Sequence, residues 1–274
     1  METVAIVIPT LNEARAISKV INLVPVDELL SAGHEPTVYV VDGHSTDNTI
    51  DIARKKGAQI ILEEGRGKGT AIRTAFQKIE ADYIIMVDGD DTYPIDAAPR
   101  MLRLLQTHDV VVGSRLKGRI EPGSMTRVNI VGNTLLTLLA RLLFNVKISD
   151  VCSGLWGFRR GAIQRLELSA RGFELEADLF AESAIKGCSI AEIPITYRKR
   201  HDRPKLASLS DGLKIGAFLF MKYLHQKKSR AAVSWAKRRG VAQTTRVTPT
   251  HRHGAKAALL LEKKADAIDE LGDD

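Results

Sequence analysis

Cysteine is scarce in this sequence, which holds only Cys152 and Cys188 in 274 residues. The two lie far apart and in no metal-ligand spacing, so a scaffold built on disulfides or on cysteine-bound metal is excluded. We expect both to be reduced, buried thiols of a cytosolic protein. The apolar fraction of 44% is ordinary, so stability can come from a hydrophobic core instead.

Long hydrophobic runs are also missing. A membrane-spanning helix needs ~18 consecutive uncharged apolar residues, and the two best candidate stretches, 128–140 and 215–221, do not reach that length. The first residues, Met1-Glu2-Thr3, lack the basic segment that begins a secretory signal. We therefore expect no leader and no spanning helix, and a protein that is soluble or lies on a membrane surface.

Aromatic residues make up only 5% of the chain, whereas an excess of lysine and arginine gives a net charge of +7. A basic balance suits anionic partners such as nucleic acid, sugar nucleotides or an anionic membrane surface. Proteins that bind single-stranded nucleic acid stack bases on aromatic side chains, but the basic stretch 227–252 holds only Trp235. We therefore expect no nucleic-acid partner.

Apolar runs at 4–8, 37–41, 59–62, 83–87 and 110–112 predict short buried strands, and helical patterns separate most of them. Strands that alternate with helices predict βαβ units and a parallel sheet. The expected fold class is α/β, with a mostly parallel sheet flanked by helices. We expect one catalytic domain over residues 1–226, followed by a mobile tail, 227–274, that is basic and then acidic.

Three carboxylates follow the strand at 83–87 within four positions: Asp88, Asp90 and Asp91. Ligands of open α/β sheets bind beyond the carboxyl ends of the strands, so these side chains should line a binding crevice. Their mutual repulsion calls for a positive partner, and Mg²⁺ commonly takes one or two protein carboxylates together with substrate phosphates. A solvated loop with helix-capping aspartates is the alternative, because Asp caps helices well.

Polar or glycine-rich segments also follow the neighbouring strands: Asp42, the loop 65–69, and Ser114-Arg115. Because these strands should end on one edge of the sheet, we expect the segments to gather near Asp88. The loop 65–69 lacks Walker spacing, and no Gly-x-Gly-x-x-Gly follows a strand. Neither a P-loop nor a dinucleotide site is therefore expected.

A series of short motifs follows along the chain: Ile8-Pro9-Thr10-Leu11-Asn12-Glu13, Asp42 with Ser45-Thr46-Asp47, Asp88-Gly89-Asp90, Gly113-Ser114-Arg115, Arg127 with Gly132-Asn133, Asp150-Val151-Cys152-Ser153-Gly154, Phe173-Glu174 with Glu176, Glu192-Ile193-Pro194-Ile195 with Tyr197, Arg200, and Lys205-Leu206. The first three resemble glycosyltransferase family 2, which has the GT-A fold and uses nucleotide sugars. The others resemble its polyprenyl-phosphate (dolichyl-phosphate) mannosyl- and glucosyltransferase branch. The resemblance covers about residues 3–225.

The resemblance implies a metal-dependent glycosyltransferase site. By it, Asp88 and Asp90 hold Mg²⁺ or Mn²⁺, and Arg115, Arg200 and Lys205 face the diphosphate or the acceptor phosphate. The GDP- or UDP-linked sugar would be bound by Pro9, Leu11, Glu13, Asp42, Lys68, Asp88 and Gly89. The sequence departs from the family where Gly43 replaces a frequent second Asp, and where Thr92 replaces a Gln that is frequent in mannosyl enzymes.

The resemblance further implies transfer, with inversion, from a nucleotide sugar to a polyprenyl phosphate. A lipid phosphate is already anionic and needs no general base, whereas a hydroxyl acceptor would need one, for which Asp150 is the best candidate. The expected catalytic residues are thus Asp90, Asp150, Arg115, Arg200 and Lys205. Two alternatives stay open: a family-2 enzyme acting on a sugar or protein hydroxyl, and a nucleic-acid binder working through the basic tail.

Three predicted helices lie outside the crevice. The one at 126–144 is apolar on more than one face, which favours a buried helix over a lipid-facing one. Along 174–186, at least two of the acidic residues should only be solvated: Glu174, Glu176, Asp178 and Glu182. The helix at 210–226 has an apolar face, with Leu213, Phe218, Phe220 and Met221, beside basic Lys222, Lys227, Lys228 and Arg230. That pattern is typical of interfacial helices, so we expect peripheral contact with the cytoplasmic face of an anionic membrane.

Overall fold

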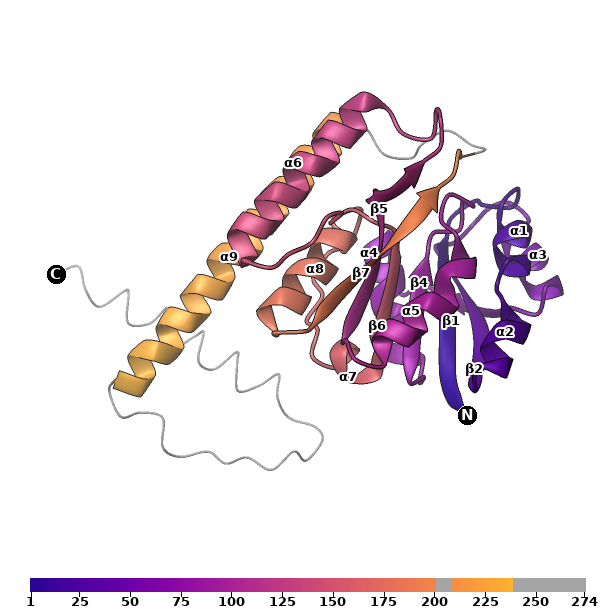
Figure 1. The fold of residues 1–274 in the computed structure, drawn as a ribbon, viewed down its shortest axis with the longest axis horizontal. Coiled ribbons are helices and arrows are strands. Elements are labelled where there is room, and N and C mark those ends of the chain that lie inside the picture. The colour runs from indigo at the N-terminus through magenta and orange to yellow at the C-terminus, as the bar shows by residue number, and fades with distance from the viewer. Residues whose placement is uncertain (201–207, 239–274) are drawn as a thin grey trace. The chain divides into compact units, whose positions relative to one another are not determined.

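The computed structural model describes residues 1–200 and 208–238 of the chain. Residues 1–228 form one compact unit, built around a seven-stranded sheet with the order β3-β2-β1-β4-β6-β5-β7 (Figure 1). The strands are β1 (Glu2–Thr10), β2 (His34–Asp42), β3 (Gln59–Leu62), β4 (Tyr83–Val87), β5 (Val110–Ile120), β6 (Leu155–Arg159) and β7 (Ile190–Tyr197).

The sheet is mixed but mostly parallel. β1 pairs in parallel with both β2 and β4, β2 with β3, and β5 with β7. β6 runs antiparallel between β4 and β5. The predicted α/β class is therefore confirmed. β6 itself was not predicted, because Gly157 interrupts its apolar run and Arg159 ends it.

Helices cover both faces of the sheet. They are α1 (Ile17–Asn22), α2 (Val26–Ser31), α3 (Thr49–Lys55), α4 (Lys68–Lys78), the short η1 (Ile95–Ala97), α5 (Ala98–Leu105), α6 (Arg127–Phe144), α7 (Arg160–Ile163), α8 (Leu175–Ile185) and α9 (Ser208–Arg238). Successive strand residues point to opposite faces. Ala5 and Val7 of β1 thus join a core with α4, α6, α8 and α9, whereas Ile6 and Ile8 join one with α1, α2 and α5.

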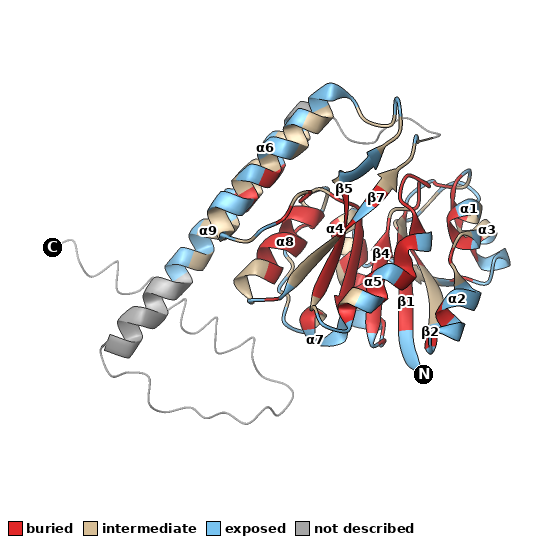
Figure 2. Ribbon diagram, viewed as in Figure 1, coloured by how far each residue is buried: buried red, intermediate tan, exposed pale blue. Residues whose placement is uncertain are grey.

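The prediction that the helix at 126–144 is buried is wrong. Only Thr137 and Ala140 of α6 are buried, and an exposed stripe runs along its outer side (Figure 2), formed by Val128, Val131, Leu135, Leu138 and Leu142. By length and composition alone, α6 could also cross a membrane, so the expectation that no helix reaches that length is corrected. The polar Asn129, Asn133 and Arg141 do not prevent this, because they interrupt the apolar run without shortening the helix.

The prediction for the acidic residues of α8 is also wrong, since Glu176, Asp178 and Glu182 are buried. Asp178 and Glu182 bind Lys222 of α9, at 2.7 Å and 2.8 Å. Burial lowers the pKa of Lys222, but these hydrogen bonds outweigh it and raise the pKa overall. Lys222 is therefore an internal anchor and is not available to a membrane.

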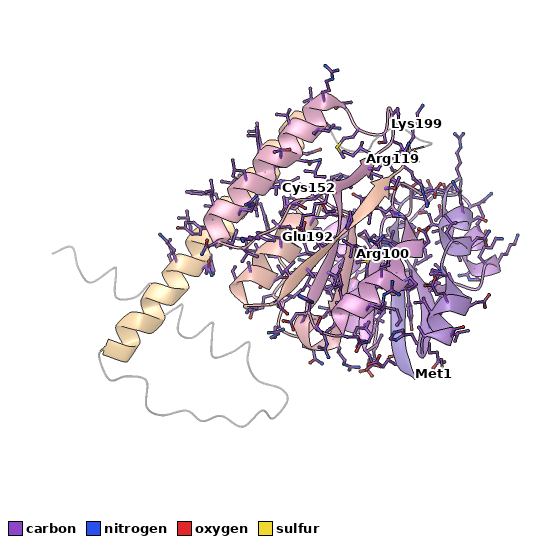
Figure 3. All side chains as sticks on the ribbon, viewed as in Figure 1. Met1, Arg100, Arg119, Cys152, Glu192 and Lys199 are labelled. Carbon is purple, nitrogen blue, oxygen red and sulfur yellow. The ribbon has the colours of Figure 1, made fainter. Side chains whose placement is uncertain are left out.

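The domain boundary expected at residue 226 falls inside α9, which continues to Arg238. Residues 229–274 form a second unit, of which the structure describes only the end of this helix. The rest of the predicted tail lies outside the described residues. Both cysteines are free; Cys188 is buried as expected, but Cys152, which is labelled in Figure 3, is only half-buried.

Candidate active site

The carboxyl ends of β1 and β2 form one side of the site. The strand register pairs Thr10 with Asp42. The Asp42 carboxylate is fully buried and accepts hydrogen bonds from Thr10 Oγ1 (3.2 Å), Ser45 N (2.7 Å) and Ser45 Oγ (2.6 Å). Asp42 therefore fixes the loop after β2 against β1.

The segment after β1 carries the predicted nucleotide-binding residues Pro9, Leu11 and Glu13. It is tied to the loop after β2, because Asn12 N donates to Ser45 Oγ at 2.8 Å. Leu11 is exposed, Pro9 is half-buried and Glu13 is buried. All three lie at the same edge of the sheet as Asp42, and Leu11 is the most open of them to a ligand.

The loop after β4 presents two of its three aspartates to the crevice. Asp90 Oδ1 accepts hydrogen bonds from Thr92 N (3.1 Å) and Thr92 Oγ1 (2.5 Å), so Thr92 holds this carboxylate in place. Asp91 adopts a left-handed backbone conformation with φ of 62°, and its buried carboxylate pairs with Lys19 instead. The expectation that Asp91 lines the crevice is therefore wrong, because its carboxylate is buried and forms an ion pair with Lys19. Gly89 lies between the two site carboxylates.

Lys68 links Asp88 to a carboxylate that the sequence did not assign to the site. Its ammonium lies 2.5 Å from Asp88 Oδ1 and 2.5 Å from Glu176 Oε1. Burial lowers the pKa of Lys68, but the two carboxylates outweigh it and hold this pKa above its usual range. Lys68 is thus a charged group that joins the loop after β4, α4 and α8.

Arg200 joins the segment after β1 to the loop after β4. Its guanidinium lies 3.0 Å from Asp90 Oδ2 and 3.2 Å from Glu13 Oε1. The structure therefore brings together Glu13, Asp90 and Arg200, three residues that are far apart in the sequence. The predicted Lys205 lies outside the described residues.

Arg115 and Asp150 are predicted site residues that bind each other. Arg115 Nε and a terminal nitrogen each lie 2.7 Å from an Asp150 oxygen, and Arg115 N donates to the same carboxylate at 3.0 Å. Both residues are buried, and the guanidinium also packs on the rings of Tyr93 and Tyr197. The geometry disfavours the roles expected for both residues. Both oxygens of Asp150 accept hydrogen bonds from Arg115, so neither is free to act as a general base, and the Arg115 guanidinium faces a protein carboxylate instead of a phosphate.

The crevice carries more negative than positive charge. Four carboxylates, those of Glu13, Asp88, Asp90 and Glu176, share the two cations Lys68 and Arg200. Burial, together with repulsion from Asp90 and Glu176, outweighs Lys68 and raises the pKa of Asp88 to about 6.

Among the described residues, no group of three or more acidic, histidine or cysteine side chains could hold a metal ion by itself. Asp88 and Asp90 nevertheless fit a Mg²⁺ or Mn²⁺ ion that takes the rest of its ligands from substrate phosphates. The charge excess favours such an ion, because a divalent cation would balance the two surplus carboxylates. The arrangement can therefore bind a metal–diphosphate group.

Glu176 is a residue of this site to which the sequence assigned no role, although it belongs to one of the motifs that carry the family resemblance. Its position on an acidic helix resembles a solvated face, and nothing local indicates that α8 turns this residue toward Lys68. The glycines on both sides of Lys68 were the available signal, because they let the chain approach another segment closely.

The chain is similar to known glycosyltransferases. The profile described as "Glycosyl transferase family 2" matches residues 5–167. The low-salt glycan biosynthesis hexosyltransferase Agl6 of Haloferax volcanii is 36% identical over 225 residues, which are 80% of this chain but only 53% of that protein. A dolichyl-phosphate hexose transferase of the same organism is 35% identical over 216 residues, covering 78% of this chain and 91% of the relative.

A solved structure shares the fold. Glucosyl-3-phosphoglycerate synthase from Mycobacterium tuberculosis, in complex with Mn²⁺, uridine diphosphate and glucosyl-3-phosphoglycerate, superposes with a TM-score of 0.63 at 22% identity. The match covers 82% of this chain and 80% of the synthase. At that identity the likeness concerns the fold alone.

Proposed function

The chain belongs to glycosyltransferase family 2, and we propose that it transfers a hexose from a nucleotide sugar to a polyprenyl phosphate. One observation carries the choice of acceptor. Both carboxylate oxygens of Asp150, the residue expected to act as base for a hydroxyl acceptor, are held by the buried Arg115 guanidinium. A hydroxyl acceptor would need a base with a free oxygen, whereas a lipid phosphate is already a nucleophile. The dolichyl-phosphate hexose transferase relative supports this acceptor.

Asp88 and Asp90 would hold the Mg²⁺ or Mn²⁺ ion. When bound, such an ion stabilises the negative charge that develops on the leaving nucleoside diphosphate. Lys68 and Arg200 would bind the diphosphate and the acceptor phosphate, because each lies beside a metal-binding carboxylate. Pro9, Leu11, Glu13, Asp42 and Gly89 would surround the base and ribose of a GDP- or UDP-linked donor. Transfer would invert the anomeric carbon, in one displacement by the acceptor phosphate.

We expect Arg200→Ala to lose about 2–4 kcal/mol of transition-state stabilisation, because the variant removes a half-buried cation from a phosphate site. The measurement is kcat/KM with donor and acceptor each varied. Lys199→Ala is the matched control, since this exposed neighbour loses the same charge outside the crevice. Equal, small effects in both variants would place Arg200 outside the reaction.

The acceptor's isoprenoid chain lies in a bilayer, so the enzyme must reach a membrane surface. α6 and α9 pack side by side: Phe144 and Tyr223 meet edge to face, with ring centroids 6.3 Å apart. Their outward residues form an α6–α9 platform of Val128, Val131, Leu135, Leu138 and Leu142 with Leu213, Phe220, Met221 and Leu224. Figure 3 shows side chains projecting from α6 away from the sheet. The two helices therefore carry nine exposed apolar side chains between them.

The charge around the platform fits an anionic leaflet. α6 has two arginines and no acidic residue, and Lys214, Lys227 and Lys228 of α9 are exposed. Each basic residue near an anionic surface contributes about 1 kcal/mol. We propose that this platform attaches the protein peripherally to the cytoplasmic leaflet. Lys222, which the sequence placed among the lipid-binding basic residues, does not take part, because it is bound to Asp178 and Glu182.

Vesicle co-sedimentation tests the platform. The double variant Leu135→Asp, Leu142→Asp should lose at least tenfold in affinity for vesicles that contain phosphatidylglycerol, because it places charge in the apolar stripe. Wild-type binding should also weaken at 0.5 M salt. Leu30→Asp on α2 is the control, since Leu30 is an exposed leucine on another helix. Unchanged binding in the double variant would reject the platform.

A further inference from the structure

Glu176 is a buried carboxylate whose position is fixed by two helices. It lies in the first turn of α8 and is 7% exposed, with Oε1 2.5 Å from the ammonium of Lys68. Lys68 begins α4 and reaches Asp88 with the same ammonium, also at 2.5 Å. Two acidic residues from different elements therefore hold one lysine beside the metal-binding loop.

Backbone contacts also hold the start of α4 against the segment before α8, independently of the Lys68 and Glu176 side chains. Gly69 N donates to Arg171 O at 3.0 Å. A Cβ at Gly67 would lie 2.4 Å from Arg171 O, and a Cβ at Gly69 would lie 2.4 Å from Ala170 O. Only glycine fits at these two positions, so the start of α4 is seated directly against the segment that leads into α8.

Asp178, half a turn beyond Glu176, secures that segment. Its carboxylate accepts hydrogen bonds from Ser169 N (2.6 Å) and Ala170 N (2.7 Å), and it binds Lys222 of α9 at 2.7 Å. The first turn of α8 thus presents Glu176 to the crevice from a braced position. A mobile surface acid could not give Lys68 a defined orientation.

The hydrogen-bond capacity of Lys68 indicates what this arrangement does. An ammonium has three N–H donors, of which Asp88 and Glu176 take two. Once Asp88 binds a divalent cation, its attraction for Lys68 weakens, and Glu176 is the partner that remains. We propose that Glu176 is a positioning residue: it keeps Lys68 directed at the diphosphate of the nucleotide sugar while Asp88 is engaged by the metal. This inference rests on the proposed function.

A double-mutant cycle between Glu176 and Lys68 tests the proposal. The readout is the affinity for GDP and for UDP with Mn²⁺, measured by calorimetry, and the nucleotide that binds wild type more tightly is used throughout. Glu176→Ala should weaken binding about tenfold in the wild-type background and less than twofold in the Lys68→Ala background, because a residue acting through Lys68 has no effect once Lys68 is gone. Glu176→Gln keeps an oxygen that accepts from the ammonium and should stay within about threefold of wild type.

Glu174→Gln is the matched control, because Glu174 is acidic, lies beside α8 and bonds to Gly172 N instead of Lys68. It should bind as wild type does. Equal losses for Glu176→Ala in both backgrounds, or no loss in either, would overturn the proposal. If Glu176→Ala does not fold, the same cycle run with Glu176→Leu, which also removes the acceptor oxygen, decides it. Nucleotide binding needs no lipid acceptor, so a failure of transfer to polyprenyl phosphate would leave this test intact.

Discussion

Asp90→Asn should lose transfer activity by about a thousandfold and bind nucleoside diphosphate equally well with Mn²⁺ and with a chelator. Asparagine has nearly the same shape as aspartate but lacks its charge, so the site keeps its form and loses one of the two carboxylates that we propose to hold the metal. Stabilisation of a leaving group by a metal and fixed charges is commonly the largest catalytic contribution. Arg200 keeps Glu13 as a partner, so the fold should be retained.

Asp96→Asn is the control for that variant. Asp96 lies six residues further on and pairs loosely with Arg198 at 3.6 Å, so the substitution removes the same charge outside the crevice. Its activity should match wild type. Persistent Mn²⁺-dependent nucleotide binding by Asp90→Asn would show that the metal is held elsewhere.

The second large effect concerns stability. Asp150→Ala should lower the free energy of unfolding by about 3–5 kcal/mol, because it leaves the buried Arg115 guanidinium without its carboxylate. Both Asp150 oxygens accept from Arg115 at 2.7 Å, and both residues are buried, so water cannot readily take the place of the carboxylate. Urea denaturation followed by circular dichroism measures the change.

Glu80→Ala provides the comparison, since Glu80 pairs with Arg160 at the surface, 3.6 Å away and largely exposed. Surface pairs of this kind contribute little, and the variant should be close to wild type in stability. If Asp150→Ala were as stable as wild type but unable to glycosylate a hydroxyl acceptor, Asp150 would be a general base after all and the acceptor argument would fail.

Much of the fold follows from local apolar patterning. The strands that supply the site, β1, β2 and β4, each contain a run of apolar residues. A polar residue ends β1 and β2, at Thr10 and Asp42, and Asp88 directly follows β4. β6 could not be identified in this way, because its central Gly157 leaves two short apolar fragments. Its place in the sheet depends on pairing with β4 and β5, which lie far away in the sequence.

The site was predictable where one loop contains the chemistry and unpredictable where distant segments meet. Asp88 and Asp90 are neighbours in one loop, and their repulsion is evident from the sequence. The pairing of Arg115 with Asp150 and of Lys68 with Glu176 depends on tertiary contacts. Charge type alone does not say whether an arginine will meet a phosphate or a protein carboxylate.

α6 illustrates a further limit of composition. An apolar helix with several apolar faces is expected to be buried in a soluble protein, yet its stripe from Val128 to Leu142 is exposed. The same composition suits a helix whose outer face meets lipid. Only the position of α6 beside α9 reveals that this face is left uncovered by the described chain.

One measurement tests the central claim most directly. The protein is incubated with Mn²⁺ and polyprenyl phosphate in detergent, together with radiolabelled GDP-mannose, UDP-glucose or UDP-N-acetylglucosamine, and the organic phase is counted. We predict that label from one of these donors enters the organic phase with wild type, and that it does not with Asp90→Asn. Label that stays out of the organic phase with every donor, but appears on a water-soluble sugar or a protein hydroxyl, would contradict transfer to a lipid phosphate.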